Sequence, residues 1–151
     1  MNILIYGFGR MGLTHYAILS KLLEKKNAKF YFVETNSKIN LFSKNNIKAV
    51  FYKSSKKVKN LSYDITLITT PPFAHVSILN ECLERGDKTI FIEKPFGGHT
   101  NITQEHLNLK NVFIGFVLRF NPIVNWIKSN INTADVQQVT STYFSNTIEK
   151  K

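Results

Sequence analysis

The sequence predicts an α/β protein built on a doubly wound parallel sheet. Short runs that are apolar throughout alternate with longer segments in which apolar residues recur at helical spacing. This alternation is typical of parallel strands that are joined by helices and buried on both faces. The first run, residues 2–6, also ends in a glycine-rich turn, GFGRMG, that leads directly into a helical segment.

Each element follows from a local pattern. The apolar runs predict strands at 2–6, 29–34, 47–52, 64–70, 88–93 and 111–117. The segments between them predict helices over 11–26, 37–46, 73–86 and 103–109. In the first helix the expected apolar face consists of Leu13, Ala17, Ile18, Leu22 and Leu23. Together these elements predict a Rossmann-type dinucleotide-binding domain over residues 1–118.

The pattern restarts after residue 118. Asn121 and Pro122 can cap and open a helix, because Asn is a good N-cap residue and Pro is favoured at the first helical position. Residues 135–144 alternate like an antiparallel strand. We therefore interpret residues 119–151 as the beginning, or a remnant, of a second α+β domain.

Length and composition exclude several classes of protein. At 151 residues the chain has the length of one domain, or of one domain and a fragment. The formal net charge of +10 could suggest nucleic-acid binding, but no nucleic-acid-binding motif accompanies the scattered lysines, so we expect no nucleic-acid partner. Cys82 is the single cysteine, and we expect it in the core rather than in a disulfide. Because Cys82 is alone and the sequence shows neither a signal peptide nor a membrane-spanning apolar stretch, we expect a cytoplasmic protein with no membrane partner. No carboxylate or thiolate stands at metal-ligand spacing, so we expect no metal site.

The glycine turn predicts a dinucleotide site. Gly7 allows the tight turn, Gly9 lets the backbone approach a diphosphate, and Gly12 lets the helix lie close to the strand, while Arg10 and Met11 stand between them. The helix N-terminus offers N–H groups to the phosphates. A structural turn without a ligand is the alternative interpretation.

An acidic residue suggests which dinucleotide is bound. Glu34 ends the second apolar run, roughly 20 residues further on, where a ribose-binding acid belongs. Its charge favours NAD(H) and would repel the 2′-phosphate of NADP(H). Arg10 or Lys38 could offset that charge, which leaves NADP(H) open.

Taken together, the segments YGFGRMG, TPPFAH, EKPFG and GFVLRFNP resemble the Gfo/Idh/MocA oxidoreductases. Members of that family bind NAD(P) on an N-terminal Rossmann domain and oxidise or reduce a sugar or cyclitol carbon held against a C-terminal sheet. The resemblance implies that Lys94 positions the substrate and transfers the proton, and that Glu93 orients Lys94 or the nicotinamide ribose. It also implies that Thr70 and Pro71 contact the cofactor.

The roles of the histidines are less determined by pattern. His75 matches a histidine of the family's segment, and we leave open whether it lies near the cofactor or caps its own turn. His15 is expected to pack within the first helix.

The resemblance also predicts what the chain lacks. The family is more than twice as long, and its second domain supplies most of the walls around the substrate. We therefore expect a truncated oxidoreductase, with two alternatives: a nucleotide-binding module without independent catalysis, and an interaction protein that retains only the fold. The protein partner of this chain could be a second copy of the chain or a separate C-terminal half.

Overall fold

The computed structural model describes residues 1–36, 39, 47–58, 61–96, 103–132, 134, 138 and 140. The chain forms two compact units, Met1–Phe116 and Val117–Lys151. Their assignment as a cofactor domain and the start of a substrate domain stays a prediction. The helix expected over 37–46 and the strand expected over 135–144 lie almost entirely outside the described residues.

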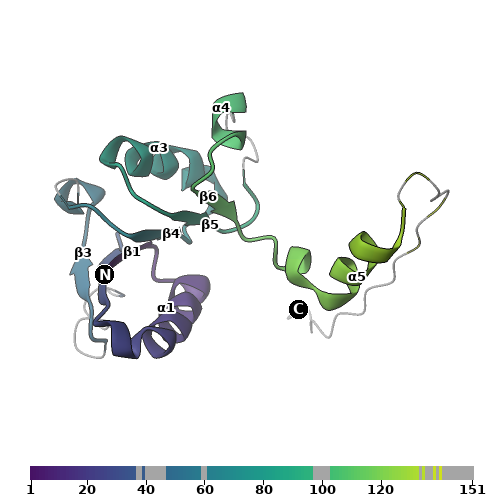
Figure 1. Cartoon of the computed structure of the whole chain (residues 1–151). Coiled ribbons are helices and arrows are strands. Elements are labelled where there is room, and N and C mark those ends of the chain that lie inside the picture. The colour runs from purple at the N-terminus through teal and green to yellow at the C-terminus, as the bar shows by residue number, and fades with distance from the viewer. Residues whose placement is uncertain are drawn as a thin grey trace, which may run out of the picture. The chain divides into compact units, whose positions relative to one another are not determined.

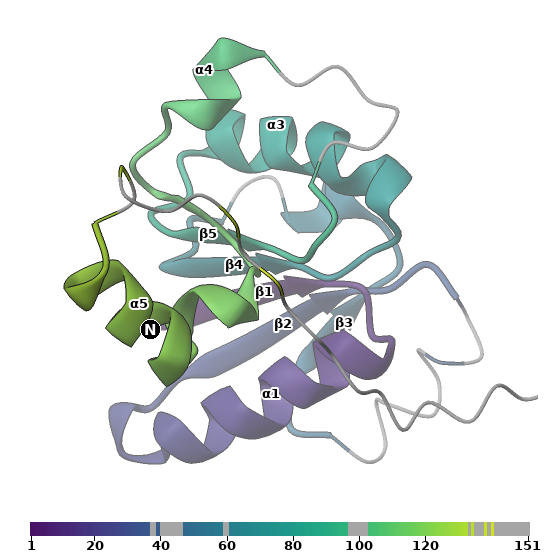
Figure 2. The same ribbon diagram turned by 90° about the vertical axis from the view of Figure 1, so that its right-hand side faces the viewer.

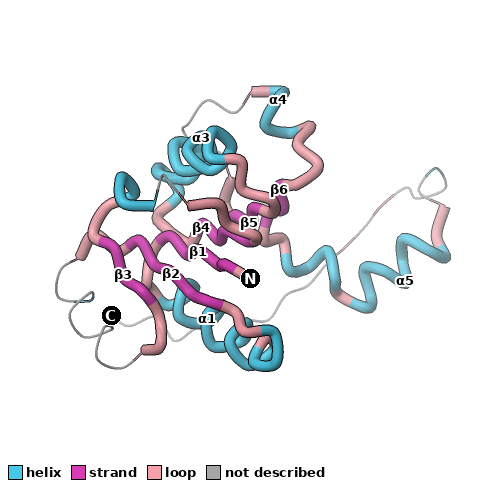
Figure 3. The backbone as a smooth tube through the Cα atoms, turned by 60° about the vertical axis from the view of Figure 1, so that its left-hand side comes forward, coloured by secondary structure: helices cyan, strands magenta, loops and turns pink. Residues whose placement is uncertain are grey.

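The first unit contains a parallel sheet. Its strands are β1 (Asn2–Tyr6), β2 (Lys29–Val33), β3 (Val50–Tyr52), β4 (Ile65–Ile68), β5 (Ile90–Ile92) and β6 (Val112–Ile114). They lie in the order β3-β2-β1-β4-β5-β6, and every neighbouring pair is parallel (Figure 3). The order reverses direction between β1 and β4, which is the arrangement of a doubly wound Rossmann sheet. The predicted fold class is therefore confirmed.

Helices cover both faces of this sheet. The helix α1 (Arg10–Leu22) lies on one face, and α3 (His75–Arg85) lies on the other, as Figures 1 and 2 show. A short helix, α4 (Gln104–Leu107), precedes β6. The second unit contains α5 (Pro122–Asn130), where the Asn121 side chain accepts a hydrogen bond from the Ile123 N–H at 2.8 Å, so the predicted cap is confirmed.

The sheet is buried on both sides because β1 is apolar at every position that faces a helix. Ile3 and Ile5 belong to the core cluster on the α1 side, and Leu4 and Tyr6 belong to the cluster on the α3 side. Side chains alternate between the two faces along a strand, so a strand covered on both faces must be apolar throughout.

The apolar face predicted for α1 is wrong. Leu13, Ile18 and Leu22 are 45%, 53% and 71% exposed, and of the expected set Leu23 is the residue that packs on the core. The helix contacts the sheet through Tyr16 and Leu19 as well. Tyr16 lies edge to face on two rings of β2, with centroids 5.0 Å and 5.7 Å away. Aromatic packing on the strand, together with the close approach at Gly12, decided the rotation of the helix.

A buried ion pair joins the end of α3 to the sheet. Arg85 and Asp87 form two hydrogen bonds, Nε to Oδ1 at 2.9 Å and Nη2 to Oδ2 at 2.5 Å, and their side chains are 4% and 0% exposed. Thr66 of β4 donates to Asp87 Oδ2 at 2.6 Å, and Arg85 Nη1 donates to the Tyr6 hydroxyl at 3.0 Å. Gly86, between the two charges, has the left-handed φ of 78° that the chain reversal needs.

The cysteine lies beside this ion pair. Cys82 is fully buried in the core cluster on the α3 side, as predicted. Burial raises the pKa of its thiol well above the ordinary value, so the thiol stays protonated and is no nucleophile at neutral pH.

Removing one partner of the buried pair should destabilise the fold strongly. Arg85→Met leaves the Asp87 carboxylate buried without its counter-charge, so we expect the free energy of unfolding to fall by about 3–5 kcal/mol. Urea unfolding followed by circular dichroism measures this. Lys88→Met is the matched control, because Lys88 pairs with Asp64 at 2.7 Å on the surface, and we expect it to leave the midpoint nearly unchanged. Equal midpoints for the two variants would contradict the prediction.

Candidate functional site

The carboxyl ends of the strands meet at one edge of the sheet, where parallel sheets bind ligands. A cavity of about 460 Å³ opens there. It is lined from several strand ends by predicted site residues, namely Gly7 after β1, Glu34 after β2, and Thr70 and Pro71 after β4. Sequence-distant candidates are therefore brought together as predicted, and their contacts with a cofactor stay predictions.

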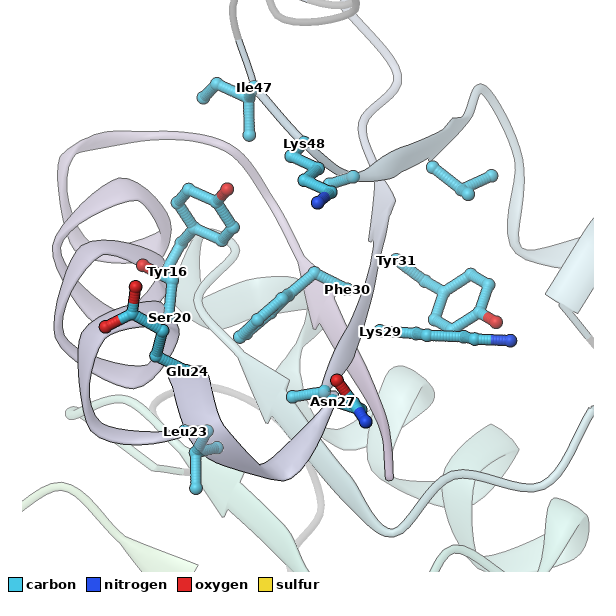
Figure 4. A pocket seen from close by; sticks show the side chains of 13 residues that line it. Tyr16, Ser20, Leu23, Glu24, Asn27, Lys29, Phe30, Tyr31, Ile47 and Lys48 are labelled. Atoms are coloured by element: carbon cyan, nitrogen blue, oxygen red, sulfur yellow. The ribbon is translucent and has the colours of Figure 1, made fainter.

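A second cavity shows that size does not identify the site. It has a volume of about 680 Å³ and is lined by residues at the beginnings of β2 and β3 and at the end of α1 (Figure 4). Tyr16, Glu24 and Lys48 are among them. This is the opposite end of the strands from the glycine turn, so the larger cavity has no part in the predicted dinucleotide site.

The three glycines of the turn differ in what the protein requires of them. Gly7 has a φ of 86°, which L residues with side chains rarely adopt. A Cβ at Gly12 would collide with the carbonyl oxygen of Gly7 and lie 2.9 Å from Thr69 Oγ1. At Gly9, by contrast, a Cβ would meet no atom within 4 Å. The fold therefore explains the first and third glycines and leaves the second unexplained.

The first turn of α1 is open at its N-terminus. The helix begins at Arg10 with Gly9 as N-cap, and no side chain caps it. The N–H groups of a first helical turn have no partner inside the helix, and they carry the positive end of its dipole. The side chains of Arg10 and Met11 are exposed in this turn.

Glu34 holds the glycine turn from the end of β2. The residue is 9% exposed. Oε2 accepts a hydrogen bond from the Phe8 N–H, and Oε1 accepts one from the Asn36 N–H, both at 2.8 Å. Sequence reasoning assigned Glu34 to the ribose and missed this second role in the protein.

His75 connects the β4 edge to the segment that carries Lys94. The residue is fully buried. Nε2 lies 2.8 Å from the carbonyl oxygen of Thr70, and Nδ1 lies 3.1 Å from that of Pro95. Because no part of His75 is exposed, any effect on a cofactor would pass through these two segments. Its predicted contact with a cofactor stays untested.

Lys94 and Glu93 follow β5 at the same edge. Lys94 is exposed, and Glu93 is partly buried, with its backbone N–H donating to the carbonyl oxygen of Ile68 at 2.9 Å. His15 Nε2 lies 2.8 Å from Glu93 Oε1. The expectation that His15 packs within its own helix is therefore wrong, because the ring extends to the neighbouring strand. The spacing could have shown this, since Gly12 must face the sheet and a residue three positions later lies on the same helix face.

Two further observations limit the chemistry of the described residues. Among them, no group of three or more His, Cys, Asp or Glu side chains could hold a metal ion. None of the helices in this part of the chain has the length and apolar character that crossing a membrane requires.

Comparison with known proteins agrees with this geometry. The sequence profile of the Gfo/Idh/MocA group, described as an oxidoreductase family with an NAD-binding Rossmann fold, matches residues 1–111. No curated protein sequence matches the chain.

Three solved structures illustrate the likeness of fold. The WlbA dehydrogenase of Chromobacterium violaceum, in complex with NADH and UDP-GlcNAcA, matches with a TM-score of 0.68 and 20% identity over 85% of this chain and 39% of its own. The scyllo-inositol dehydrogenase of Lactobacillus casei with NAD(H) and scyllo-inositol matches with a TM-score of 0.65 and 24% identity, over 85% of this chain and 40% of its own. A myo-inositol dehydrogenase of Corynebacterium glutamicum matches with a TM-score of 0.65 and 21% identity, over 86% of this chain and 41% of its own. The chain thus spans about two fifths of the length of these enzymes.

The contrast between Gly9 and Gly12 predicts different effects on stability. Gly12→Ser forces a side chain against the Gly7 backbone, and we expect it to lower the free energy of unfolding by about 1–3 kcal/mol. Gly9→Ser is the matched control, because its side chain enters open space and serine is a favoured N-cap residue. We expect no loss of stability there. Urea unfolding measures both free energies of unfolding. A larger decrease for Gly9→Ser than for Gly12→Ser would contradict the packing argument.

Proposed function

Because this chain belongs to the Gfo/Idh/MocA oxidoreductase family and carries its NAD-binding Rossmann domain, we propose that it is the cofactor half of a dehydrogenase that acts on a sugar or cyclitol. The dinucleotide would lie along the carboxyl edge of the sheet. Its diphosphate would lie over the first turn of α1, with the adenosine toward Glu34 and the nicotinamide toward Lys94.

One observation carries the proposal. Among the described residues nothing requires position 9 to be a glycine, since a Cβ there would meet no atom within 4 Å. A ligand supplies the missing reason, because a diphosphate must approach the backbone of this turn closely to reach the N–H groups of the helix. Gly9 is thus explained by an occupant, whereas Gly7 and Gly12 are explained by the fold.

The surroundings of Glu34 favour NAD(H) over NADP(H). The carboxylate lines the cavity at the strand ends and is fixed by the N–H groups of Phe8 and Asn36. A fixed negative charge can accept hydrogen bonds from ribose hydroxyls and repels a 2′-phosphate. Lys38, which could offset this charge, lies outside the described residues.

Lys94 would handle the proton of the reaction. A bound nicotinamide cofactor would supply the hydride chemistry, as NAD for oxidation of a carbinol carbon and as NADH for reduction of a carbonyl. Lys94 is exposed and follows β5 at the edge where that carbon would lie. In its neutral form the Lys94 amine would accept the hydroxyl proton during oxidation, and in its protonated form it would return the proton during reduction. Glu93 and Pro95, on either side, would orient it.

The sugar or cyclitol class rests on the substrates named for the similar structures, UDP-GlcNAcA and scyllo-inositol. The second candidate function is a dinucleotide-binding module without turnover of its own. It is favoured by the exposure of Lys94 and of the first turn of α1, because hydride transfer needs substrate and cofactor held in near-attack geometry by walls on both sides. A separate C-terminal half or a second copy of the chain would be its partner.

Binding of NADH tests the proposal directly. We expect NADH to bind with a change in its fluorescence and NADPH to bind more weakly, because Glu34 opposes the 2′-phosphate. Gly9→Ser should weaken NADH binding at least roughly tenfold while the protein stays folded, because the new side chain occupies the place of the diphosphate. Unchanged affinity in Gly9→Ser, or no binding by the wild type, would contradict the proposal.

Turnover tests the role of Lys94. With NAD and a panel of sugars and cyclitols, we expect the formation of NADH, followed by its absorbance, to fall by roughly 100-fold or more in Lys94→Ala. Lys88→Ala removes an exposed amine near the opposite end of β5 and serves as the control. Equal rates in wild type and Lys94→Ala would exclude the catalytic assignment. Retained NADH binding without any turnover would favour the binding module.

A further inference from the structure

A side-chain hydrogen bond links the helix of the glycine turn to the segment after β5 that carries Lys94. His15 lies on α1 one turn after Gly12, and its Nε2 is 2.8 Å from Glu93 Oε1. The two side chains are 21% and 12% exposed, so the contact is largely shielded from water. It is a long-range contact that joins two edges of the site which share no backbone hydrogen bond.

The surroundings hold both partners in place. The His15 ring lies edge to face on Phe91 of β5, with centroids 5.2 Å apart. Phe91 and Glu93 are two residues apart, so they point to the same face of the sheet. Gly115, just after β6, leaves room for both: a Cβ there would lie 2.9 Å from Phe91 Cζ and 3.4 Å from Glu93 Oε2. Helix α1 and the ends of β5 and β6 therefore form one packed unit around the carboxylate.

The contact has a consequence for the position of Lys94. A carboxylate that is mostly buried needs a donor, since an unsatisfied charged group in a shielded place is costly. Without the His15 N–H, the Glu93 side chain must turn toward water or toward other donors. Lys94 is the next residue in the chain, and it follows a strand that has already ended at Ile92. Loss of this hydrogen bond would thus change the packing around the segment that carries Lys94.

We propose that His15 is a positioning residue that, through Glu93, fixes the nicotinamide end of the site relative to the glycine turn. This inference rests on the proposed function, because it assumes a dinucleotide that extends from one to the other. A residue that only supported the fold would affect the binding of all parts of the dinucleotide equally, whereas this role affects one end. The diphosphate and adenosine are bound by the glycine turn and the cavity near Glu34, whereas the nicotinamide end alone depends on the His15–Glu93 contact.

The experiment compares two ligands on the same variants. Affinities of NADH and of ADP, which lacks the nicotinamide riboside, are measured by calorimetry for the wild type, His15→Phe and His15→Gln. Phenylalanine keeps a ring against Phe91 and removes the N–H, whereas glutamine keeps an N–H donor for Glu93. Leu19→Ala is the control for looser packing of α1, because Leu19 packs on the core from the same helix.

We expect His15→Phe to weaken NADH binding roughly tenfold and to leave ADP binding unchanged. His15→Gln should recover most of the NADH affinity. Leu19→Ala should change both affinities by the same factor. In a Glu93→Ala background, His15→Phe should have no further effect, because its partner is already gone.

Several outcomes would overturn the inference. If NADH affinity is equal in wild type and His15→Phe, or falls by the same factor as ADP affinity, His15 has no specific role at the nicotinamide end. An undiminished effect of His15→Phe in the Glu93→Ala background would show that it does not act through Glu93. If the wild type binds neither NADH nor ADP, the proposed function itself fails, which is a different result from a failure confined to His15.

Discussion

The close approach of α1 to the ends of β1 and β4 constrains the rest of the site. A Cβ at position 12 has no room between the Gly7 carbonyl and the Thr69 hydroxyl, and Thr69 in turn donates to the carbonyl oxygens of Tyr6 and Gly7 at 2.8 Å and 3.1 Å. Because the glycine turn packs so closely against these groups, the direction and rotation of α1 are determined. Its N-terminus faces the open edge of the sheet, and the residues one turn later face β5. The His15–Glu93 contact follows from this placement of the helix, and so would the proposed position of a dinucleotide.

The edge of the sheet is held together by side chains that each connect two segments. Glu34 connects β2 to the glycine turn, His75 connects the end of β4 to Pro95, and His15 connects α1 to Glu93. The ends of parallel strands have no ladder partners beyond the last pair, so loops at this edge need other hydrogen bonds to be well ordered. A site assembled from such loops depends on these connections as much as on the residues that would contact a ligand. The two histidines are therefore supports of the Lys94 segment, from opposite faces of the sheet.

The Arg85–Asp87 pair stabilises the fold rather than lining the candidate cavity. It lies at the end of α3, accepts a hydrogen bond from Thr66 of β4, and reaches the end of β1 through the Tyr6 hydroxyl. Such a buried pair is costly to break. The candidate site, by contrast, keeps exposed or partly exposed groups, including Lys94 and the first turn of α1.

The sequence by itself determined the strands, the glycine turn, the helix end at Gly86 and the cap at Asn121, because each depends on local chemistry: uninterrupted apolar runs, left-handed glycine and a capping amide. It also placed Gly7, Glu34, Thr70 and Pro71 at one edge, since the ends of parallel strands must meet there. Only the tertiary structure decided which face of α1 is buried, that His15 reaches Glu93, and that His75 lies between two carbonyl groups. Those outcomes depend on how closely a helix can approach a sheet and on which aromatic rings it contacts there. The hydrophobic periodicity of one helix carries no information about either.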